Sequence, residues 1–485
     1  MSALSVQSLT ILSRTRQIVL PVTFELNHGE IFAILGETGS GKSLIGSAIM
    51  GLLPRGISAE GRLTIDGQTF SVMDRTRLHA YWAQKIFLLP QEPLNALAPL
   101  LPAYSHVAEQ LPWPTAESKA RGALLRMQLD MEDHHKRPFE LSGGMAQRLI
   151  AAIATVTPAE ILVVDEPTKG LDGDRREIVA ELFKALRAEG RAIVLITHDI
   201  NLARKVADRV AFLHEGNFIE VGATEQVLNS PATAYAQRYV ASDPSTWGRR
   251  PFVRSSTPKV IEAQNLTIGA GGRVLAQGLS FHCHAGQISA LLGRSGVGKT
   301  TLGRTLLGIT PAFAGDVARA CEEPGRRALQ KLHQDPTRVF APWQSIGRSL
   351  DDMKRLRGGE AATKALPMLL ERFNLRKDLL ERRPDQISGG EAQRLALARI
   401  LALKPRFLVA DEPTSRLDPP VQEEVLKLLR EVVDESGLSV LLITHDRDVA
   451  FSVADRQMEL TDASGRSAHL NDLTNRAPIF YGSVS

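Results

Sequence analysis

The chain has 485 residues, 43% of them apolar, which suits two large domains with a hydrophobic core each rather than a single one. Its formal charge of +4 is small for this length and does not favour nucleic acid as a partner. The two cysteines, Cys283 and Cys321, exclude a disulfide framework or a four-cysteine metal site and are typical of the reducing cytosol. The sequence has no run of about 18 apolar residues and no basic-then-apolar N-terminus, so we expect neither a membrane span nor a secretory signal.

Short apolar runs alternate with segments of helical period in both halves of the chain. The apolar runs predict buried strands at 31–35, 161–164 and 192–196, and again at 288–292, 407–410 and 440–443. Helical patterns follow them, for example at 44–52, 145–153 and 176–186. This alternation predicts an α/β fold in each half, with a mainly parallel sheet covered by helices and ligands at the carboxyl ends of the strands.

The two halves carry the same motifs in the same order and at nearly the same spacing, which indicates duplication of a whole domain. We predict a first domain over 1–241, a linker over 242–258 and a second domain over 259–485. The linker is rich in Pro, Ser, Gly and Arg. A short linker explains Trp247, Arg249 and Arg250 with fewer assumptions than a nucleic-acid-binding arm. The second half lacks a counterpart of 61–84, which we interpret as the loss of an edge hairpin.

A glycine-rich loop follows the first buried strand of each half and precedes a helical pattern. The first loop consists of Gly36, Glu37, Thr38, Gly39, Ser40, Gly41, Lys42 and Ser43, and the second of Gly293, Arg294, Ser295, Gly296, Val297, Gly298, Lys299 and Thr300. Glycines let backbone N–H groups converge on phosphate oxygens at a helix N-terminus. We therefore expect Lys42 and Lys299 to bridge the terminal phosphates of a nucleotide, and Ser43 and Thr300 to offer hydroxyls to Mg²⁺.

A second repeated motif is LSGGMAQR at 141–148, which recurs as ISGGEAQR at 387–394. It resembles the signature of the ATP-binding-cassette (ABC) family, and the resemblance covers nearly the whole chain. The family implies two tandem P-loop NTPase domains, each with a helical signature subdomain, that bind ATP and Mg²⁺ and hydrolyse ATP in a transport-coupled reaction. It also implies that Ser142, Gly143 and Gly144, and likewise Ser388, Gly389 and Gly390, meet the γ-phosphate of the opposite cassette.

Other residues match this family one by one. Asp165 and Asp411 end buried strands in Asp-Glu-Pro-Thr, resembling the element that binds Mg²⁺, and Glu166 and Glu412 would be the general bases. The alternative is that these acids only cap helices, and the phosphate loops in both halves disfavour it. The remaining matches are the Q-loop glutamines Gln91 and Gln334, the switch histidines His198 and His445, and the D-loop aspartates Asp172 and Asp418. The resemblance implies two complete, crossed ATP sites.

One feature of the family is missing. An aromatic residue usually stacks on adenine at about 25 residues before the phosphate loop, but the neighbourhoods 10–13 and 267–269 contain none. Ile11 and Ile268 are the candidates for an apolar face in its place.

Two further segments resemble the ATPases of dipeptide, oligopeptide and nickel importers. They are the Pro231…Tyr235…Tyr239 tail and the run QEPLNALAP at 91–99. The resemblance implies an energy-coupling subunit for peptides, nickel or a related small solute, peripheral on the cytoplasmic face of the inner membrane. Its partners would be two integral-membrane permease subunits, contacted near 95–104 and 340–346, and indirectly an extracytoplasmic solute-binding protein, with no nucleic acid.

Three other twin-cassette classes are alternatives. Soluble factors that act on ribosomes resemble this chain less, because they carry a long charged helical linker. DNA-repair ATPases need cysteine-rich zinc inserts that two cysteines cannot supply. Fused sugar-importer ATPases differ in cargo, and their second cassette usually looks degenerate, whereas this one does not.

Overall fold

The computed structural model describes residues 2–82, 84–168, 171, 173–251, 256–320, 328–355, 359–462 and 468–473. The chain divides into two compact units, Met1–Ala241 and Ser242–Ser485. No helix in the described ranges combines the length and the apolar character that crossing a bilayer requires.

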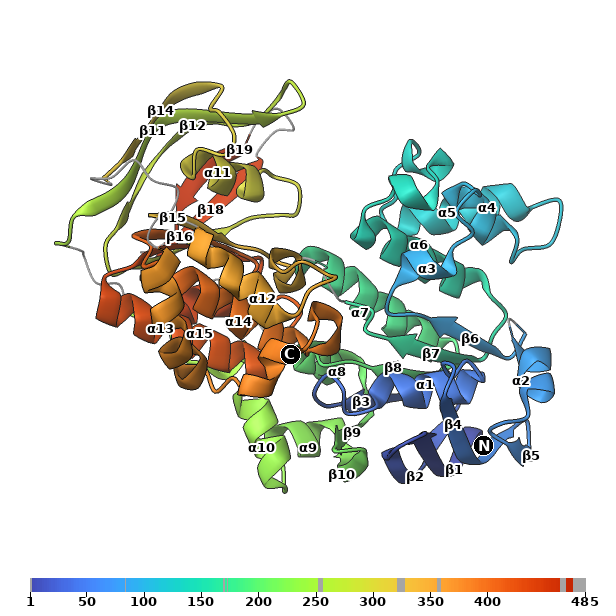
Figure 1. The fold of residues 1–485 in the computed structure, drawn as a ribbon. Helices are drawn as coiled ribbons and strands as arrows, with labels where there is room; N and C mark the ends of the chain where they lie inside the picture. Colours follow the sequence, from blue (N-terminus) through green and yellow to red (C-terminus); the bar gives the residue numbers. More distant parts are fainter. Residues whose placement is uncertain are drawn as a thin grey trace. The chain divides into compact units, whose positions relative to one another are not determined.

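The first unit is built on a six-stranded sheet (Figure 1). In spatial order its strands are β10 (Asn217–Ala223), β9 (Arg209–His214), β3 (Ile31–Leu35), β8 (Ala192–Ile196), β7 (Ile161–Asp165) and β6 (Ile86–Leu89). All neighbours pair in parallel except β10 with β9. Every residue of β3 and β8 is buried, which explains why these strands are continuous apolar runs rather than alternating ones.

Helices follow the central strands and make the parallel connections. α1 (Lys42–Met50) follows β3, α7 (Gly173–Ala188) follows β7, and α8 (Ile200–Val206) follows β8. The predicted α/β architecture is therefore confirmed. Between β6 and β7 the chain leaves the sheet to form a helical layer of α3 (Pro93–Ala96), α4 (Ala103–Ala108), α5 (Ala116–Arg126) and α6 (Gly143–Val156), which pack on one another (Figure 1).

An antiparallel sheet of β2 (Gln17–Asn27), β1 (Ser2–Ser13), β4 (Ile57–Ile65) and β5 (Gln68–Ser71) completes the first unit. The segment 61–84, interpreted from the sequence as an edge hairpin, forms the β4–β5 hairpin and also α2 (Arg75–Tyr81). Leu78 of α2 is fully buried and lies against Gly51, the residue that follows α1. The helix α2 therefore covers the end of α1.

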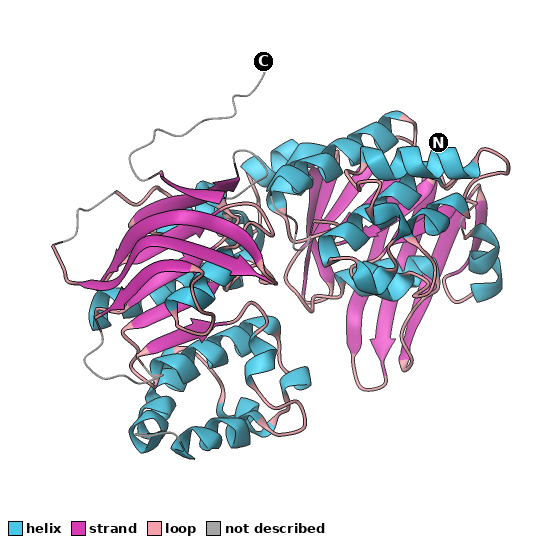
Figure 2. Cartoon of the chain, turned by 90° about the horizontal axis from the view of Figure 1, so that it is seen from above, coloured by secondary structure: helices cyan, strands magenta, loops and turns pink. Residues whose placement is uncertain are grey.

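The second unit repeats this plan in one nine-stranded sheet (Figure 2). In spatial order the strands are β14 (Ala314–Arg319), β11 (Lys259–Ala270), β12 (Arg273–His284), β19 (Ala468–Asp472), β18 (Arg456–Asp462), β13 (Ile288–Leu292), β17 (Ser439–Ile443), β16 (Phe407–Asp411) and β15 (Leu329–Leu332). Its main helices are α11 (Lys299–Leu306), α12 (Ile346–Asp351), α13 (Gly359–Arg372), α14 (Gly389–Leu401), α15 (Pro419–Ser436) and α16 (Arg447–Val453). Strands β18, β13, β17, β16 and β15 run in parallel.

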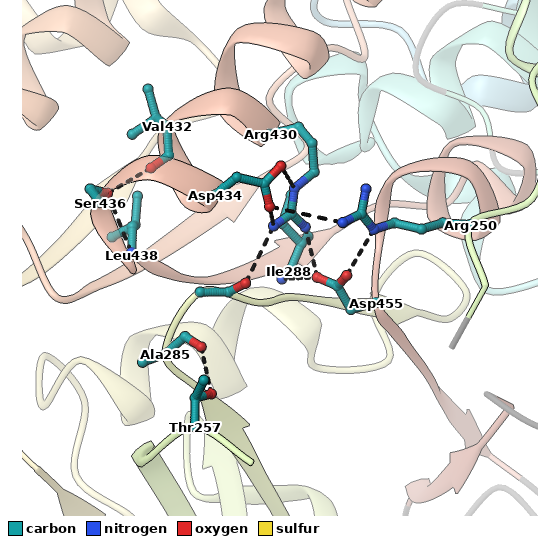
Figure 3. Close-up of polar contacts among 11 residues, drawn as sticks. Arg250, Thr257, Ala285, Ile288, Arg430, Val432, Asp434, Ser436, Leu438 and Asp455 are labelled. Carbon is teal, nitrogen blue, oxygen red and sulfur yellow. Dashed lines mark hydrogen bonds and ion pairs between the residues drawn. The ribbon is translucent and has the colours of Figure 1, made fainter. Parts of the chain in front are cut away.

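The segment 242–251, predicted as part of a linker, is folded against the second unit. Trp247 packs on its hydrophobic core, and the Arg249 guanidinium lies 4.1 Å from the centre of the Phe451 ring. Arg250 Nε donates to Asp455 Oδ1 at 2.8 Å (Figure 3). Asp455 also accepts from Arg430 at 2.7 Å and from the N–H of Ile288 at 2.8 Å, so this carboxylate joins the segment to α15 and β13.

Replacing Asp455 with Asn tests how much this junction stabilises the second unit. Asp455 and Arg430 are nearly buried, with 6% and 12% of their side chains exposed, so the substitution removes the buried carboxylate that Arg430 and Arg250 share and leaves Arg430 only the half-exposed Asp434. We expect a loss of about 3 kcal/mol in the free energy of unfolding. Urea denaturation followed by tryptophan fluorescence measures it.

The matched control is Asp208→Asn in the first unit. Asp208 accepts the N–H of Ile31 in the same way, but its arginine partner, Arg187, is 42% exposed. A loss of about 1 kcal/mol or less is expected there. Equal losses in the two variants would show that the buried Arg430–Asp455 pair adds nothing to the free energy of unfolding.

Candidate nucleotide-binding sites

In each glycine-rich loop the first glycine lies too close to neighbouring backbone for a residue with a Cβ atom. Gly36 has φ of 152° and Gly293 has φ of 145°. A Cβ atom would lie 2.2 Å from the carbonyl oxygen of Leu213 at Gly36, and 2.6 Å from that of Leu460 at Gly293. The loops are thereby fixed between the end of the first central strand and the first turn of α1 or α11.

Each loop surrounds a buried lysine ammonium. Lys42 Nζ donates to the carbonyl oxygens of Gly36 at 2.6 Å and Glu37 at 2.8 Å. Lys299 Nζ donates to those of Gly293 at 2.5 Å and Arg294 at 2.9 Å. Each lysine is the first residue of its helix and its ammonium group is held by carbonyl oxygens of the loop, a position in which a cation and a helix N-terminus can both meet the phosphates of a nucleotide.

Oxygen ligands suited to Mg²⁺ lie beside each loop. Ser43 Oγ is 3.1 Å from Asp165 Oδ1, and Thr300 Oγ1 is 3.2 Å from Asp411 Oδ1. A hydroxyl next to a carboxylate is a hard oxygen donor set, so these pairs fit Mg²⁺. The parallel register brings each pair together, because β7 and β3, and likewise β16 and β13, end at the same edge of their sheets.

The two glutamates after these aspartates have a strained backbone. Glu166 has φ of 50° and Glu412 has φ of 47°, in the left-handed region that residues with a Cβ rarely adopt. Their N–H groups donate to Ile196 at 2.8 Å and Ile443 at 2.9 Å on the neighbouring strand. The same strained turn in both units directs the glutamate side chains toward the histidines, as expected of a functional position.

The histidines and one glutamine meet these glutamates. His198 Nδ1 lies 2.7 Å from Glu166 Oε2, and His445 Nδ1 lies 3.3 Å from Glu412 Oε1. Gln334 Nε2 donates to Glu412 Oε2 at 2.8 Å. In the first unit, the described residues include no hydrogen bond between Gln91 and Glu166. In the second unit these contacts join three of the predicted residues, Gln334, Glu412 and His445.

The signature residues begin helices, as the sequence indicates. Ser142 caps α6, where its hydroxyl accepts the N–H of Met145 at 3.3 Å. Ser388 caps α14 in a reciprocal arrangement with Glu391. Both serines are exposed, so the N-termini of the two helices face solvent within their own units. Asp172 lies outside the described residues, and Asp418 directly precedes the first residue of α15.

The proposed substitutes for the adenine-stacking aromatic are wrong. Ile11 and Ile268 are fully buried in the cores formed by β1 and β11, with 0% of their surface exposed. Their side chains belong to the hydrophobic cores that also contain residues of α1 and α11, so neither offers an exposed apolar face to a base.

The two tyrosines of the Pro231…Tyr235…Tyr239 tail contact the first phosphate loop. Both lie on α10 (Ala234–Ala241). Tyr239 donates from its hydroxyl to the carbonyl oxygen of Gly36 at 3.1 Å, and the N–H of Glu37 donates to the Tyr235 hydroxyl at 3.2 Å. The tail therefore braces the loop from behind, and no local sequence signal could show this contact across about 200 residues of chain.

A lysine outside every sequence motif contacts the second site. Lys331 Nζ lies 2.8 Å from Asp411 Oδ2, with 14% and 10% of the two side chains exposed. Aligning the Q-loop glutamines Gln91 and Gln334 places Leu88 at the corresponding position of the first unit. The second site therefore has a cation beside its candidate Mg²⁺ ligand, where the first has an apolar side chain.

Fold and site geometry together define an ATPase with two P-loop cassettes. The sequence pattern of the ABC transporter family matches residues 19–169 and 276–415, and the chain belongs to that family. The peptidoglycan transport ATP-binding protein YejF of Agrobacterium fabrum is 33% identical, over 90% of this chain and 86% of that protein. The glutathione import ATP-binding protein GsiA of Salmonella typhimurium is 30% identical, over 90% of this chain and 80% of that protein.

Solved structures with two cassettes have the same fold. The RNase-L inhibitor superposes with a TM-score of 0.66 at 17% identity, covering 96% of this chain and 90% of that one. A ribosome-bound archaeal Pelota and ABCE1 assembly gives 0.70 at 18% identity, covering 96% and 78%. At these identities the likeness shows the fold alone.

Tyr239→Phe tests the brace behind the first loop. The ring stays and the hydrogen bond to Gly36 is lost, so we expect roughly fivefold weaker ATP binding at the first site, corresponding to about 1 kcal/mol. Fluorescent-ATP titration in a Lys299→Ala background, which weakens the second site, measures it. Tyr81→Phe on α2 is the control and should bind as the parent does, whereas equal affinity of both variants would refute the brace.

Proposed function

We propose that this ATPase is the energy-coupling subunit of an importer for a peptide-class solute. The proposal is supported by similarity over most of the chain to peptidoglycan and glutathione transport proteins. Each unit also has the Lys, hydroxyl, Asp, Glu and His groups that an ATPase site needs. Glutathione is a small peptide and peptidoglycan contains peptides, so these relatives favour a peptide over nickel. A related small solute is the alternative cargo.

The chemistry assigned to each unit is hydrolysis of ATP by water. Lys42 and Lys299 bind the terminal phosphates and offset their charge. Glu166 and Glu412 accept a proton from the attacking water, while His198 and His445 hold those carboxylates in place through the contacts at 2.7 and 3.3 Å. Mg²⁺ held by Ser43 with Asp165, and by Thr300 with Asp411, would neutralise charge on the phosphates.

Each site is proposed to be completed by the signature helix of the other unit. Lys42, Ser43, Gln91, Asp165, Glu166 and His198 would work with Ser388, Gly389 and Gly390. Lys299, Thr300, Gln334, Asp411, Glu412 and His445 would work with Ser142, Gly143 and Gly144. The exposure of both helix N-termini supports this arrangement, because their N–H groups and dipoles are available to a γ-phosphate presented from outside the unit.

The proposed partners are two integral-membrane permeases and, indirectly, an extracytoplasmic solute-binding protein. The subunit would lie on the cytoplasmic face of the inner membrane and contact the permeases near 95–104 and 340–346. Both segments follow a Q-loop glutamine in the sequence. A movement of either segment would reach the catalytic edge of the sheet through that glutamine.

Glu166→Gln combined with Glu412→Gln tests the base assignment. Glutamine has the same size but accepts no proton, so ATP binding should persist while steady-state turnover falls by about 100-fold or more. Filter binding of labelled ATP and phosphate release measure the two quantities. Glu181→Gln, on α7 with 62% of its side chain exposed, is the control, and a double variant with full turnover would exclude both glutamates as bases.

A tagged pull-down from detergent-solubilised cells, with ATP and vanadate present, tests the importer assignment. Recovery of two polytopic membrane proteins supports it, and recovery of ribosomal proteins without any permease refutes it.

A further inference from the structure

Lys331 contacts the candidate Mg²⁺ ligand of the second site. Its Nζ atom lies 2.8 Å from Oδ2 of Asp411, while Thr300 Oγ1 lies 3.2 Å from Oδ1 of the same carboxylate. Lys331 and Asp411 expose 14% and 10% of their side chains, so the pair lies largely out of water, where charges act on one another strongly. The charge of this aspartate is therefore offset before any metal arrives.

The strand registers place a leucine at this position of the first unit. Lys331 of β15 pairs with the residue two before Asp411, and Leu88 of β6 pairs with the residue two before Asp165. The two side chains therefore occupy equivalent places in the two sheets. Leu88 packs on the hydrophobic core that also contains residues of α1. The position that holds a cation in the second unit thus holds an apolar side chain in the first.

The two phosphate loops differ in charge in the same direction. Glu37 follows the first glycine of the first loop, and Arg294 follows that of the second. Both residues belong to the turn that holds the lysine ammonium, because their carbonyl oxygens accept from Lys42 at 2.8 Å and from Lys299 at 2.9 Å. The exchange of glutamate for arginine makes the second loop more positive, as the lysine beside Asp411 does for the metal position.

These differences bear on how much each site gains from Mg²⁺. The metal favours nucleotide binding because it neutralises phosphate charge and is attracted to the aspartate. Lys331 weakens that attraction, since it offsets the charge of Asp411 and repels a second cation. Arg294 adds attraction for phosphates that requires no metal. Both effects reduce the advantage that Mg²⁺ gives to nucleotide binding at the second site.

We propose that Lys331, with a smaller contribution from Arg294, makes nucleotide binding at the second site depend much less on Mg²⁺ than binding at the first site. This inference rests on the proposed ATPase function and goes beyond it, because the matching catalytic groups of the two units give no reason for a difference. Lys331 is a specificity-determining residue: it sets the metal requirement of one site of the pair.

Titration of the full-length chain with a fluorescent, non-hydrolysable ATP analogue tests the proposal through binding alone. Lys42→Ala isolates the second site and Lys299→Ala isolates the first. The measured quantity is the metal ratio, defined as the affinity for the analogue in Mg²⁺ divided by that in EDTA. By linkage, this ratio reports how much more tightly the bound nucleotide holds Mg²⁺ than the free nucleotide does. We expect a metal ratio about tenfold smaller at the second site than at the first.

Lys331→Leu, which introduces the residue of the first unit, should raise the metal ratio of the second site about tenfold. Lys354→Leu is the matched control, because it removes the same charge from a side chain that is 55% exposed. An unchanged ratio in Lys331→Leu, or an equal rise in both variants, overturns the proposal.

A second variant covers the case in which Lys331→Leu fails to fold by circular dichroism. Arg294→Glu then decides, since Arg294 is exposed and the exchange should still raise the metal ratio severalfold. An unchanged ratio in that variant overturns the proposal. Failure of the proposed function gives a different result, because neither isolated site would then bind the analogue in either buffer, and that result overturns both.

Discussion

Both nucleotide sites depend on the parallel register of three buried strands in each unit. The pairing of β3 with β8 and of β8 with β7 places the phosphate loop, the acidic pair and the histidine at one edge of the first sheet. Because parallel strands end at the same edge, Ser43 and Asp165, which are 122 positions apart in the sequence, meet there within hydrogen-bond distance. The register also stabilises the left-handed turn at Glu166, since its N–H finds an acceptor on β8.

The sequence predicted what depends on local pattern and on order along the chain. Buried strands such as 288–292 were found because a strand covered on both faces is a continuous apolar run. The glycine-rich loops were found because the close approach of Gly36 and Gly293 to neighbouring backbone excludes other residues. These features are written in consecutive residues, so no knowledge of tertiary contacts was needed.

The features that the sequence did not predict are long-range. Neither Tyr239 behind the first loop nor Lys331 beside Asp411 belongs to a local pattern that identifies its partner. Ile11 was assigned to a ligand-binding face because its distance from the loop fitted, although its place in β1 puts it in the core. Spacing along the chain places a residue near a site, but the pleat of a strand decides which side of the sheet it faces.

The Lys331–Asp411 pair has a consequence for symmetry. In a homodimer of single cassettes, every substitution appears twice and alters both sites in the same way. Here the two copies share one polypeptide, so a lysine beside one aspartate and a leucine at the equivalent position of the other coexist in every molecule. Because one polypeptide contains both cassettes, the two sites are always present in a ratio of one to one. They can keep the same catalytic groups and still acquire different ion requirements.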